Sequence, residues 1–308
     1  MSGSTASAGM SRRGLVLFTA MSIIWGIPYL LIKVALYDLT PSFLVFARTA
    51  IAAAVLLPLA IRRGIVGPAL AHWRPLVAFA GLEIALPWFL VGDAERHMPS
   101  SLAGLLIATV PLIGAVVAWR LGDASAVTGG RLVGLIVGMV GVAAVVGLDL
   151  GSGTSLLAVA EIMLVSIGYA TAPIIASRRL ADVPTLAVIA VSLTGVAILY
   201  APAAVLARPR TMPRTSVLAA VVVLGLVCTA IAFLVFFALI AEIGPVRATV
   251  ITFVNPVVAV ALGVGVLGES FTAGIALGFP LVLLGSWLAT RKPKPALSMA
   301  GDGAQPGT

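Results

Sequence analysis

The sequence predicts an all-α integral membrane protein, with ten transmembrane helices arranged as two inverted five-helix repeats. Three observations lead to this prediction: an apolar composition, ten separate apolar runs of spanning length, and a resemblance between the two halves of the chain. Of the 308 residues, 61% are hydrophobic and 10% are charged, and the mean hydropathy is +1.17. Soluble domains carry about 25% charged residues, so this composition excludes a soluble enzyme with a large core.

A helix needs about 20 predominantly apolar residues to cross a bilayer. We expect helices because backbone polar groups in hydrocarbon must be hydrogen-bonded within the segment, and no run shows the alternating polarity of barrel strands. The first run is too long for the apolar region of a signal peptide, so we expect it to be retained. The predicted spans are Leu15–Leu36, Ser42–Ile61, Leu76–Val91, Ser101–Trp119, Leu132–Leu148, Leu156–Ala176, Leu186–Leu206, Val217–Ile240, Val246–Leu267 and Thr272–Ala289.

The two halves of the chain resemble each other at an offset of 144 to 146 residues. The matched positions are Trp25 and Tyr169, Pro58 and Pro202, Gly81 and Gly225, Pro111 and Pro256, Gly122-Asp123 and Gly268-Glu269, Gly134 and Gly278, and Gly141 and Gly285. Each unit contains five spans, and because five is odd, the second unit is expected to enter the membrane from the opposite side. Inverted repeats are typical of secondary transporters, which hold substrate near the midplane between the repeats.

Glycines at four-residue spacing predict how two of these spans pack. Small residues four apart let helix backbones approach closely in lipid. The fifth span has Gly130, Gly134 and Gly138, and the tenth has Gly274 and Gly278. We therefore expect the fifth and tenth spans to be a closely packed scaffold.

Basic residues indicate the orientation, because cytoplasmic loops are enriched in Lys and Arg. With the N-terminus inside, thirteen Lys and Arg residues fall on the cytoplasmic side, and four fall outside, namely Arg96, Arg208, Arg210 and Arg214. The net charge of +8 is thus explained by topology, and we expect a lipid bilayer and no nucleic acid as partner. The predicted organisation is a cytoplasmic tail over 1–13, a first unit over 14–150, a second unit over 151–291 and a disordered, cytoplasmic tail over 292–308.

The paired motifs resemble those of the EamA family within the drug/metabolite transporter superfamily, over residues 14 to 291. The matching residues are Pro111, Gly122-Asp123 and Gly134, then Asn255-Pro256, Gly268-Glu269 and Gly278, with Trp25-Gly26, Lys33 and Arg48. The chain departs from the pattern at Asp123, where the family usually has Glu, and in two extra residues before Gly134. The resemblance implies ten helices around a central cavity and outward carriage of small metabolites, often amino acids. A subset of the family exports aromatic amino acids, which we expect for this chain.

Among the eleven acidic residues, only Glu83 and Glu161 lie well inside predicted spans. Charges inside a membrane are costly, so each is a functional hypothesis. Glu83 would bind a substrate ammonium group or serve as a protonatable coupling site; the alternative is a neutral carboxyl that locks two helices together. Glu161 lies about one turn inside the outer end of its span, where a helix N-terminus favours an anion. A structural role is favoured there.

Two cationic residues lie toward the outer ends of the first two spans. Lys33 and Arg48 would close an outer gate or meet a carboxylate. The alternative is snorkelling of a long aliphatic stem to the interface, which is favoured for Lys33. Arg48 is deeper, and its planar fork suits a carboxylate or a row of carbonyls. Both are assigned gating or structural roles.

Aromatic residues make up only 6% of the chain, so their positions carry information. Trp25 and Tyr29 share a helical face, Tyr169 is the repeat-related counterpart of Trp25, Trp88 follows a proline, and Phe233 lies in the eighth span. Aromatic side chains that line a cavity stack on flat or apolar groups and bind cations. The alternative is a lipid-facing or interfacial position. We assign these five residues to substrate binding.

Prolines and short polar residues mark broken helix geometry. Pro111 and Pro256 each free a carbonyl one turn earlier, and they are assigned gating or structural roles. Thr109, Thr252 and Asn255 lie near the midplane beside them, where they would bind substrate or repair the helix. Asn255 is the best polar candidate because its amide both donates and accepts.

The motifs that the sequence lacks restrict the function. There is no phosphate-binding loop and no nucleophile elbow, His72 and His97 fall in opposite loops, and the single Cys228 excludes an intrachain disulfide. We predict no catalytic residue, metal or cofactor.

The sequence therefore predicts an inner-membrane exporter of small metabolites, most of all amino acids with aromatic or bulky apolar side chains, working by alternating access. Proton coupling is open, and we expect a monomer or weak homodimer. The alternatives are a multidrug, nucleotide or sugar-type carrier, an integral-membrane enzyme acting on lipid-linked substrates, and a scaffold.

Overall fold

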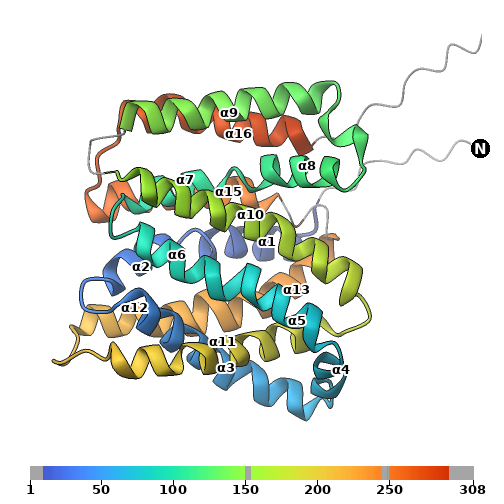
Figure 1. Cartoon of the computed structure of the whole chain (residues 1–308), viewed down its shortest axis with the longest axis vertical. Helices are drawn as coiled ribbons and strands as arrows, with labels where there is room; N and C mark the ends of the chain where they lie inside the picture. The colour runs from blue at the N-terminus through green and yellow to red at the C-terminus, as the bar shows by residue number, and fades with distance from the viewer. Residues whose placement is uncertain (1–9, 150–153, 245–247, 249, 291–308) are drawn as a thin grey trace, which may run out of the picture.

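The computed structural model describes residues 10–149, 154–244, 248 and 250–290. The regular elements of these residues are helices, as the composition predicted (Figure 1). The predicted disordered tail over 292–308 and residues 1–9 of the predicted N-terminal tail lie outside the described residues. The first unit contributes α1 (Arg12–Ile24), α2 (Pro28–Ala35), α3 (Pro41–Arg62), α4 (Val66–Ala71), α5 (Trp73–Ala80), η1 (Gly81–Ala85), α6 (Leu86–Ala94), α7 (Ser100–Ile107), α8 (Val110–Arg120), η2 (Ala124–Val127) and α9 (Gly130–Asp149).

The second half of the chain contributes the remaining helices. They are α10 (Leu156–Arg179), α11 (Thr185–Leu206), α12 (Thr215–Gly225), η3 (Leu226–Ile231), α13 (Ala232–Ile243), α15 (Ile251–Leu267) and α16 (Ala273–Thr290). In the described part of the chain, nine helical stretches are long and apolar enough to cross a membrane, and α15 is a shorter apolar helix. The predicted ninth span begins at Val246, in a stretch that lies largely outside the described residues.

The third span is longer than predicted. The sequence indicated Leu76–Val91, whereas the helical stretch runs from Trp73 to Ala94. The prediction stopped short because Arg74 and Asp93 interrupt the apolar run at its two ends. Charged side chains are accommodated at span ends because their long stems let the charge reach the interface.

Several spans are broken near their middles, at proline or at π-helical turns. The first span is interrupted before Pro28 and the fourth before Pro111, where the ring removes a backbone donor. The third and eighth spans contain π-helical turns, η1 and η3, which begin at or next to the repeat-related Gly81 and Gly225. Such turns are frequent at functional sites because they displace a side chain from the regular helical register.

Helices of the two halves pack against one another in pairs. α9 lies along α16 at one edge of the bundle and α3 along α11 toward the other, with α7, α10 and α15 between them (Figure 1). The interface of α9 and α16 is made of glycines: a Cβ placed on Gly141 would lie 2.7 Å from the backbone nitrogen of Val282 and 2.9 Å from the Gly278 carbonyl. The close approach that the glycine spacing predicted is therefore present.

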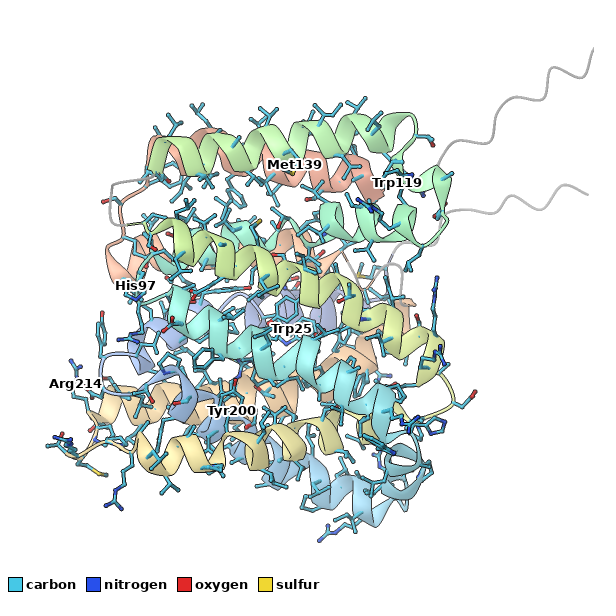
Figure 2. The ribbon with its side chains drawn as sticks, in the orientation of Figure 1. Trp25, His97, Trp119, Met139, Tyr200 and Arg214 are labelled. Carbon is cyan, nitrogen blue, oxygen red and sulfur yellow. The ribbon has the colours of Figure 1, made fainter. Side chains whose placement is uncertain are left out.

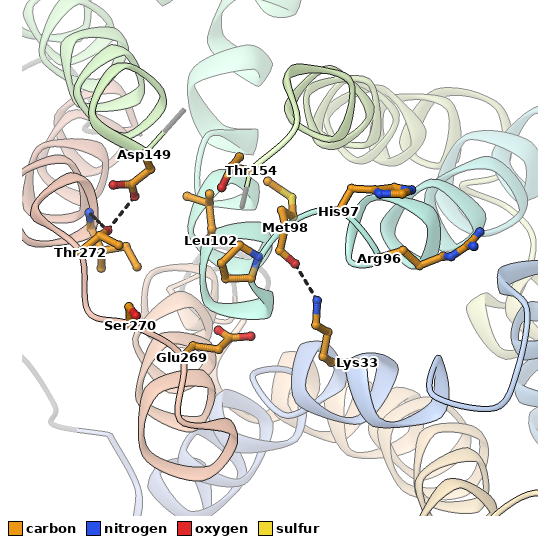
Figure 3. Close-up of a pocket in the computed structure, with 12 residues that line it drawn as sticks. Lys33, Arg96, His97, Met98, Leu102, Asp149, Thr154, Glu269, Ser270 and Thr272 are labelled. Atoms are coloured by element: carbon orange, nitrogen blue, oxygen red, sulfur yellow. Dashed lines mark hydrogen bonds between the residues drawn. The ribbon is translucent and has the colours of Figure 1, made fainter. Parts of the chain in front are cut away.

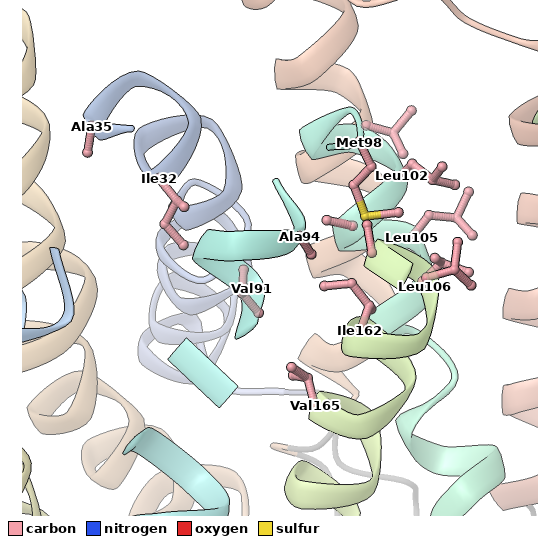
Figure 4. Close-up of a cluster of buried hydrophobic side chains, with 14 of the residues drawn as sticks. Ile32, Ala35, Val91, Ala94, Met98, Leu102, Leu105, Leu106, Ile162 and Val165 are labelled. Carbon is pink, nitrogen blue, oxygen red and sulfur yellow. The ribbon is translucent and has the colours of Figure 1, made fainter. Parts of the chain in front are cut away.

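A buried apolar cluster joins four helices, α2, α6, α7 and α10. Figure 4 shows Ile32 of α2, Val91 of α6, Leu105 of α7 and Ile162 of α10 in this cluster. Dispersion contacts of this kind drive helix association in lipid, where the hydrophobic effect between helices is weak.

Candidate functional site

A cavity of about 340 Å³ lies in the middle of the bundle. It is lined at the helix breaks of α1–α2 and α7–α8, at the π-helical turns η1 and η3, and by α3, α10, α13 and α15. Figure 2 shows Trp25, one of its lining residues, in the centre of the molecule. Binding sites for small molecules usually enclose about 300–1,000 Å³, so the volume suits a small metabolite.

Eight of the nine residues that the sequence assigned to substrate binding line this cavity. They are Trp25, Tyr29, Glu83, Trp88, Tyr169, Phe233, Thr252 and Asn255. The ninth, Thr109, is not in the lining: its buried hydroxyl donates to the Leu106 carbonyl at 2.6 Å and to Ser166 Oγ at 3.4 Å. Thr109 thus repairs the helix break, which was the alternative to a binding role.

The residues assigned to gating or structure lie in three places. Arg48, Pro111 and Pro256 line the central cavity. Lys33 borders a second cavity, at the helix ends that the predicted orientation places outside. Glu161 lines neither cavity; it lies on α10, within electrostatic reach of Asp93 and His97.

Arg48 is buried in α3, and two residues hold its guanidinium. Its Nε donates to Thr229 Oγ1 at 2.9 Å, and its Cζ lies 3.7 Å from the centroid of the Trp88 ring. Thr229 in turn donates to the Leu224 carbonyl at 2.8 Å, five residues earlier, within the π-helical turn. The turn therefore directs the threonine hydroxyl to the arginine, and the snorkelling alternative does not apply to Arg48.

Glu83 lies in η1 and contributes the acidic group of the cavity. Its Oε2 is buried and has no hydrogen-bond partner among the described residues. The helix-locking hydrogen bond, which was the alternative to a functional role, is therefore not present at that oxygen. Tyr169 interacts electrostatically with both Glu83 and Arg48, which places these three groups in one polar part of the cavity.

One wall of the cavity is aromatic. The Trp25 ring lies 4.7 Å from the Phe236 ring and 6.0 Å, edge on, from the Phe233 ring, centroid to centroid. Phe236 and Cys228 also line the cavity, although the sequence did not assign them to the site. Phe236 could have been found because it lies three residues after Phe233 and so shares its helical face.

Asn255 of α15 also lines the cavity, and its side chain is hydrogen-bonded to backbone carbonyls. In the amide orientation that satisfies hydrogen bonding, its nitrogen donates to the Ile251 carbonyl at 2.9 Å and to the Ser22 carbonyl at 3.1 Å. The amide nitrogen thus connects α15 to α1, and its oxygen is the atom of this side chain that remains for a ligand.

A second cavity, of about 320 Å³, lies where α2, the loop between α6 and α7, and the loop between α15 and α16 meet (Figure 3). The Lys33 ammonium turns inward and donates to the carbonyls of Glu95 and of Met98, the latter at 2.9 Å. Lys33 therefore joins α2 to the loop that follows α6 and is not extended toward the interface.

Glu269, from the second half of the chain, lines the same cavity and contacts the start of α7. Its carboxylate oxygens accept the backbone N–H groups of Ser100 at 2.7 Å and of Ser101 at 2.9 Å, at the N-terminus of α7, where an anion is favoured. Burial raises the pKa of Glu269, but the hydrogen bonds from Ser101 and Ser100 outweigh it and hold the pKa below its usual value. Gly268, with φ 68°, makes the turn that places this carboxylate. We call the Lys33 and Glu269 contacts together the outer latch, after the side of the membrane on which the predicted orientation places them.

Comparisons with known proteins agree with this architecture. The EamA-like transporter family matches the chain twice, over residues 12–147 and 156–291. The proteins named uncharacterized inner membrane transporter YedA, from Escherichia coli K12 and from Escherichia coli O157:H7, are each 31% identical to it over 290 residues, covering 89% of this chain and 92% of theirs. A solved crystal structure, 24% identical, superimposes with a TM-score of 0.64 and covers 92% of this chain and 98% of the other; it supports the fold.

Proposed function

This chain belongs to the EamA-like transporter family, and we propose that it is a secondary carrier that exports amino acids with aromatic or bulky apolar side chains. The observation that carries the proposal is the composition of the central cavity. One buried cation, one buried carboxyl group and an aromatic wall all face a volume of about 340 Å³. A zwitterionic head group with an apolar side chain matches all three features.

The proposed mechanism is alternating access between two inverted five-helix units. It takes α15 as a spanning helix, which makes ten spans and places both termini in the cytoplasm of an inner-membrane protein. Support comes from the family match to each half of the chain and from the pairing of α3 with α11 and α9 with α16, which are corresponding helices of the two units. Helix breaks and π-helical turns lie at the cavity, where small shifts of the helix halves change access.

Two other classes of function remain as alternatives. A carrier of drugs, nucleotides or sugars would use the same fold with other substrates. An integral-membrane enzyme acting on lipid-linked substrates would need a nucleophile, metal or acid–base pair, and in the described part of the chain no cluster of three His, Cys, Asp or Glu residues suited to a metal is found. The cavity favours neither alternative as directly as it favours a zwitterion.

Efflux from proteoliposomes tests the proposal. Liposomes that contain the purified protein are loaded with labelled amino acids, with and without a proton gradient. We expect selective efflux of phenylalanine and tryptophan over alanine and lysine, weakened by Trp25→Ala, which removes the centre of the aromatic wall. If efflux depends on the proton gradient in the wild type and no longer does in Glu83→Gln, the carrier is proton-coupled. If wild-type efflux is the same with and without the gradient, the protein is a facilitator. If no amino acid leaves the liposomes, the substrate class is wrong.

A further inference from the structure

We infer that Arg48 is the carboxylate receptor of the central cavity, so that this carrier selects substrates that bear a carboxylate beside an apolar group. This inference rests on the proposed function and makes it more specific. The sequence left open whether Arg48 meets a carboxylate or has a gating or structural role, and the inference assigns it a direct role in binding.

The guanidinium is held in one orientation by contacts that leave its terminal nitrogens available. The Nε–H is used by Thr229, and one face of the group is covered by the Trp88 ring. The side chain nevertheless lines the cavity, and no hydrogen bond joins its Nη atoms to another described residue. Four donors therefore remain, in the planar arrangement that matches the two oxygens of a carboxylate.

Arg48 forms no ion pair with another described residue, Glu83 of the same cavity included. The side chains that interact with it electrostatically are Cys228, Tyr169 and Tyr29, and none of them is a carboxylate. A buried charge without a partner is costly in any protein interior and more so within a bilayer. A substrate carboxylate would place a negative charge beside the guanidinium, so binding would offset this cost.

The surroundings also explain why the ligand would be more than a free anion. Trp88 and Tyr169 stand beside the guanidinium, and the Trp25–Phe236 wall lies in the same cavity. Aromatic walls give no binding energy to a small inorganic anion but bury the side chain of an aromatic acid. The expected ligands are therefore aromatic or bulky apolar carboxylates, with or without an amino group.

A structural role is the competing explanation for Arg48. The Nε–Thr229 hydrogen bond connects α3 to η3, so the arginine could serve only to join the two halves of the chain. The two roles differ in ligand selectivity: a structural arginine would affect all ligands equally, whereas a receptor affects only those that carry the carboxylate.

The test is equilibrium binding to the purified full-length protein in detergent, by calorimetry. Three ligands are compared: phenylalanine, 3-phenylpropionate, which lacks the amino group, and phenylalaninamide, which lacks the carboxylate. In Arg48→Gln we expect phenylalanine and 3-phenylpropionate to bind at least about tenfold more weakly, because charge-assisted hydrogen bonds are lost. Phenylalaninamide should change by less than about threefold. Arg63→Gln, an exposed arginine beyond the end of α3, is the matched control and should change nothing.

Arg48→Lys keeps the charge but loses the fork and the bond through Nε, and we expect it to restore part of the 3-phenylpropionate affinity. This variant and the wild type keep the inference testable if Arg48→Gln fails to fold, because wild-type protein must bind 3-phenylpropionate more tightly than phenylalaninamide. Equal weakening of all three ligands in Arg48→Gln overturns the inference and leaves the proposed function standing. Absence of binding of every ligand to the wild type overturns both.

Discussion

The outer latch makes a specific prediction about access to the cavity. Glu269→Gln removes the negative charge that accepts two backbone N–H groups at the start of α7, at 2.7 and 2.9 Å. Hydrogen bonds to charged groups contribute about 1.5–3 kcal/mol each, but this carboxylate is half exposed and glutamine retains one neutral acceptor. A net loss of about 2 kcal/mol follows, which shifts the opening equilibrium of the latch about 30-fold.

The single cysteine of the chain provides the assay. Cys228 lines the central cavity and is 1% exposed, so a membrane-impermeant thiol reagent reaches it only when the outer side opens. We expect Glu269→Gln to raise the labelling rate from the outside by about tenfold or more. Ser270→Ala, an exposed neighbour in the same loop, is the control and should label at the wild-type rate. Equal rates for wild type and Glu269→Gln would refute the latch.

The pH dependence gives an independent check. The folded-state pKa of Glu269 is lowered from its ordinary value of 4.5, so its contribution is fully present above pH 4.5 and is lost as the pH falls through the lowered pKa. Wild-type labelling should rise toward the rate of Glu269→Gln below pH 4.5. The ratio of the two rates at each pH cancels the titration of the thiol. Burial raises the pKa of Glu95, Lys33 lowers it and Glu269 raises it, so both rates are compared in a Glu95→Gln background to remove this second titration.

Three further outcomes are expected. Gly141→Ala should lower the melting temperature of the solubilised protein, because overpacking against fixed backbone costs about 1–3 kcal/mol. Gly147→Ala is the control and should leave the melting temperature unchanged, since a Cβ there would meet nothing within 4 Å. Equal melting temperatures of the two variants would contradict the close packing of α9 on α16. Lys33→Gln should raise Cys228 labelling as Glu269→Gln does, and the two increases should multiply in the double variant, because one opening breaks both contacts and their free energies add. Asp38→Asn should lower the melting temperature only slightly at pH 7, because the Arg214 side of its ion pair, 2.6 Å apart, is exposed to solvent and such pairs contribute little to stability. A drop as large as that of Gly141→Ala would contradict this.

The fold was predictable because membrane insertion imposes strong rules on the sequence. Apolar runs had to be helices, and glycines at four-residue spacing had to bring α9 and α16 together. The limits of the third span were missed because Arg74 and Asp93 are polar in the sequence yet continue the helix in space. Arg208, Arg210 and Arg214 fall on the side predicted to be outside, against the positive-inside rule. Arg214 has a structural partner there, since it pairs with Asp38.

The cavity residues were predictable one by one, but their partners were not. Buried charges and midspan aromatics in a membrane segment have few other uses, which is why Glu83 and Trp25 stood out. The contact of Arg48 with Thr229 could not be foreseen, because it joins positions 181 residues apart through a π-helical turn. The outer latch was missed for the same reason: Glu269 was recognised as part of a repeated motif, but its partners at the start of α7 lie 168 and 169 residues away.

The duplicated scaffold and the asymmetric site fit together in a single physical account. At the repeat offset, Arg48 corresponds to Ser192 and Glu83 to Val227, so the second unit carries neither charge of the cavity. It supplies instead Thr229, which orients Arg48, and Phe233 and Phe236, which build the wall. Glu269 of the second unit likewise accepts a backbone N–H group at the N-terminus of α7, a helix of the first unit. Because each unit holds only part of the site and of the latch, movement of one unit against the other would change both together, as the proposed alternating access requires.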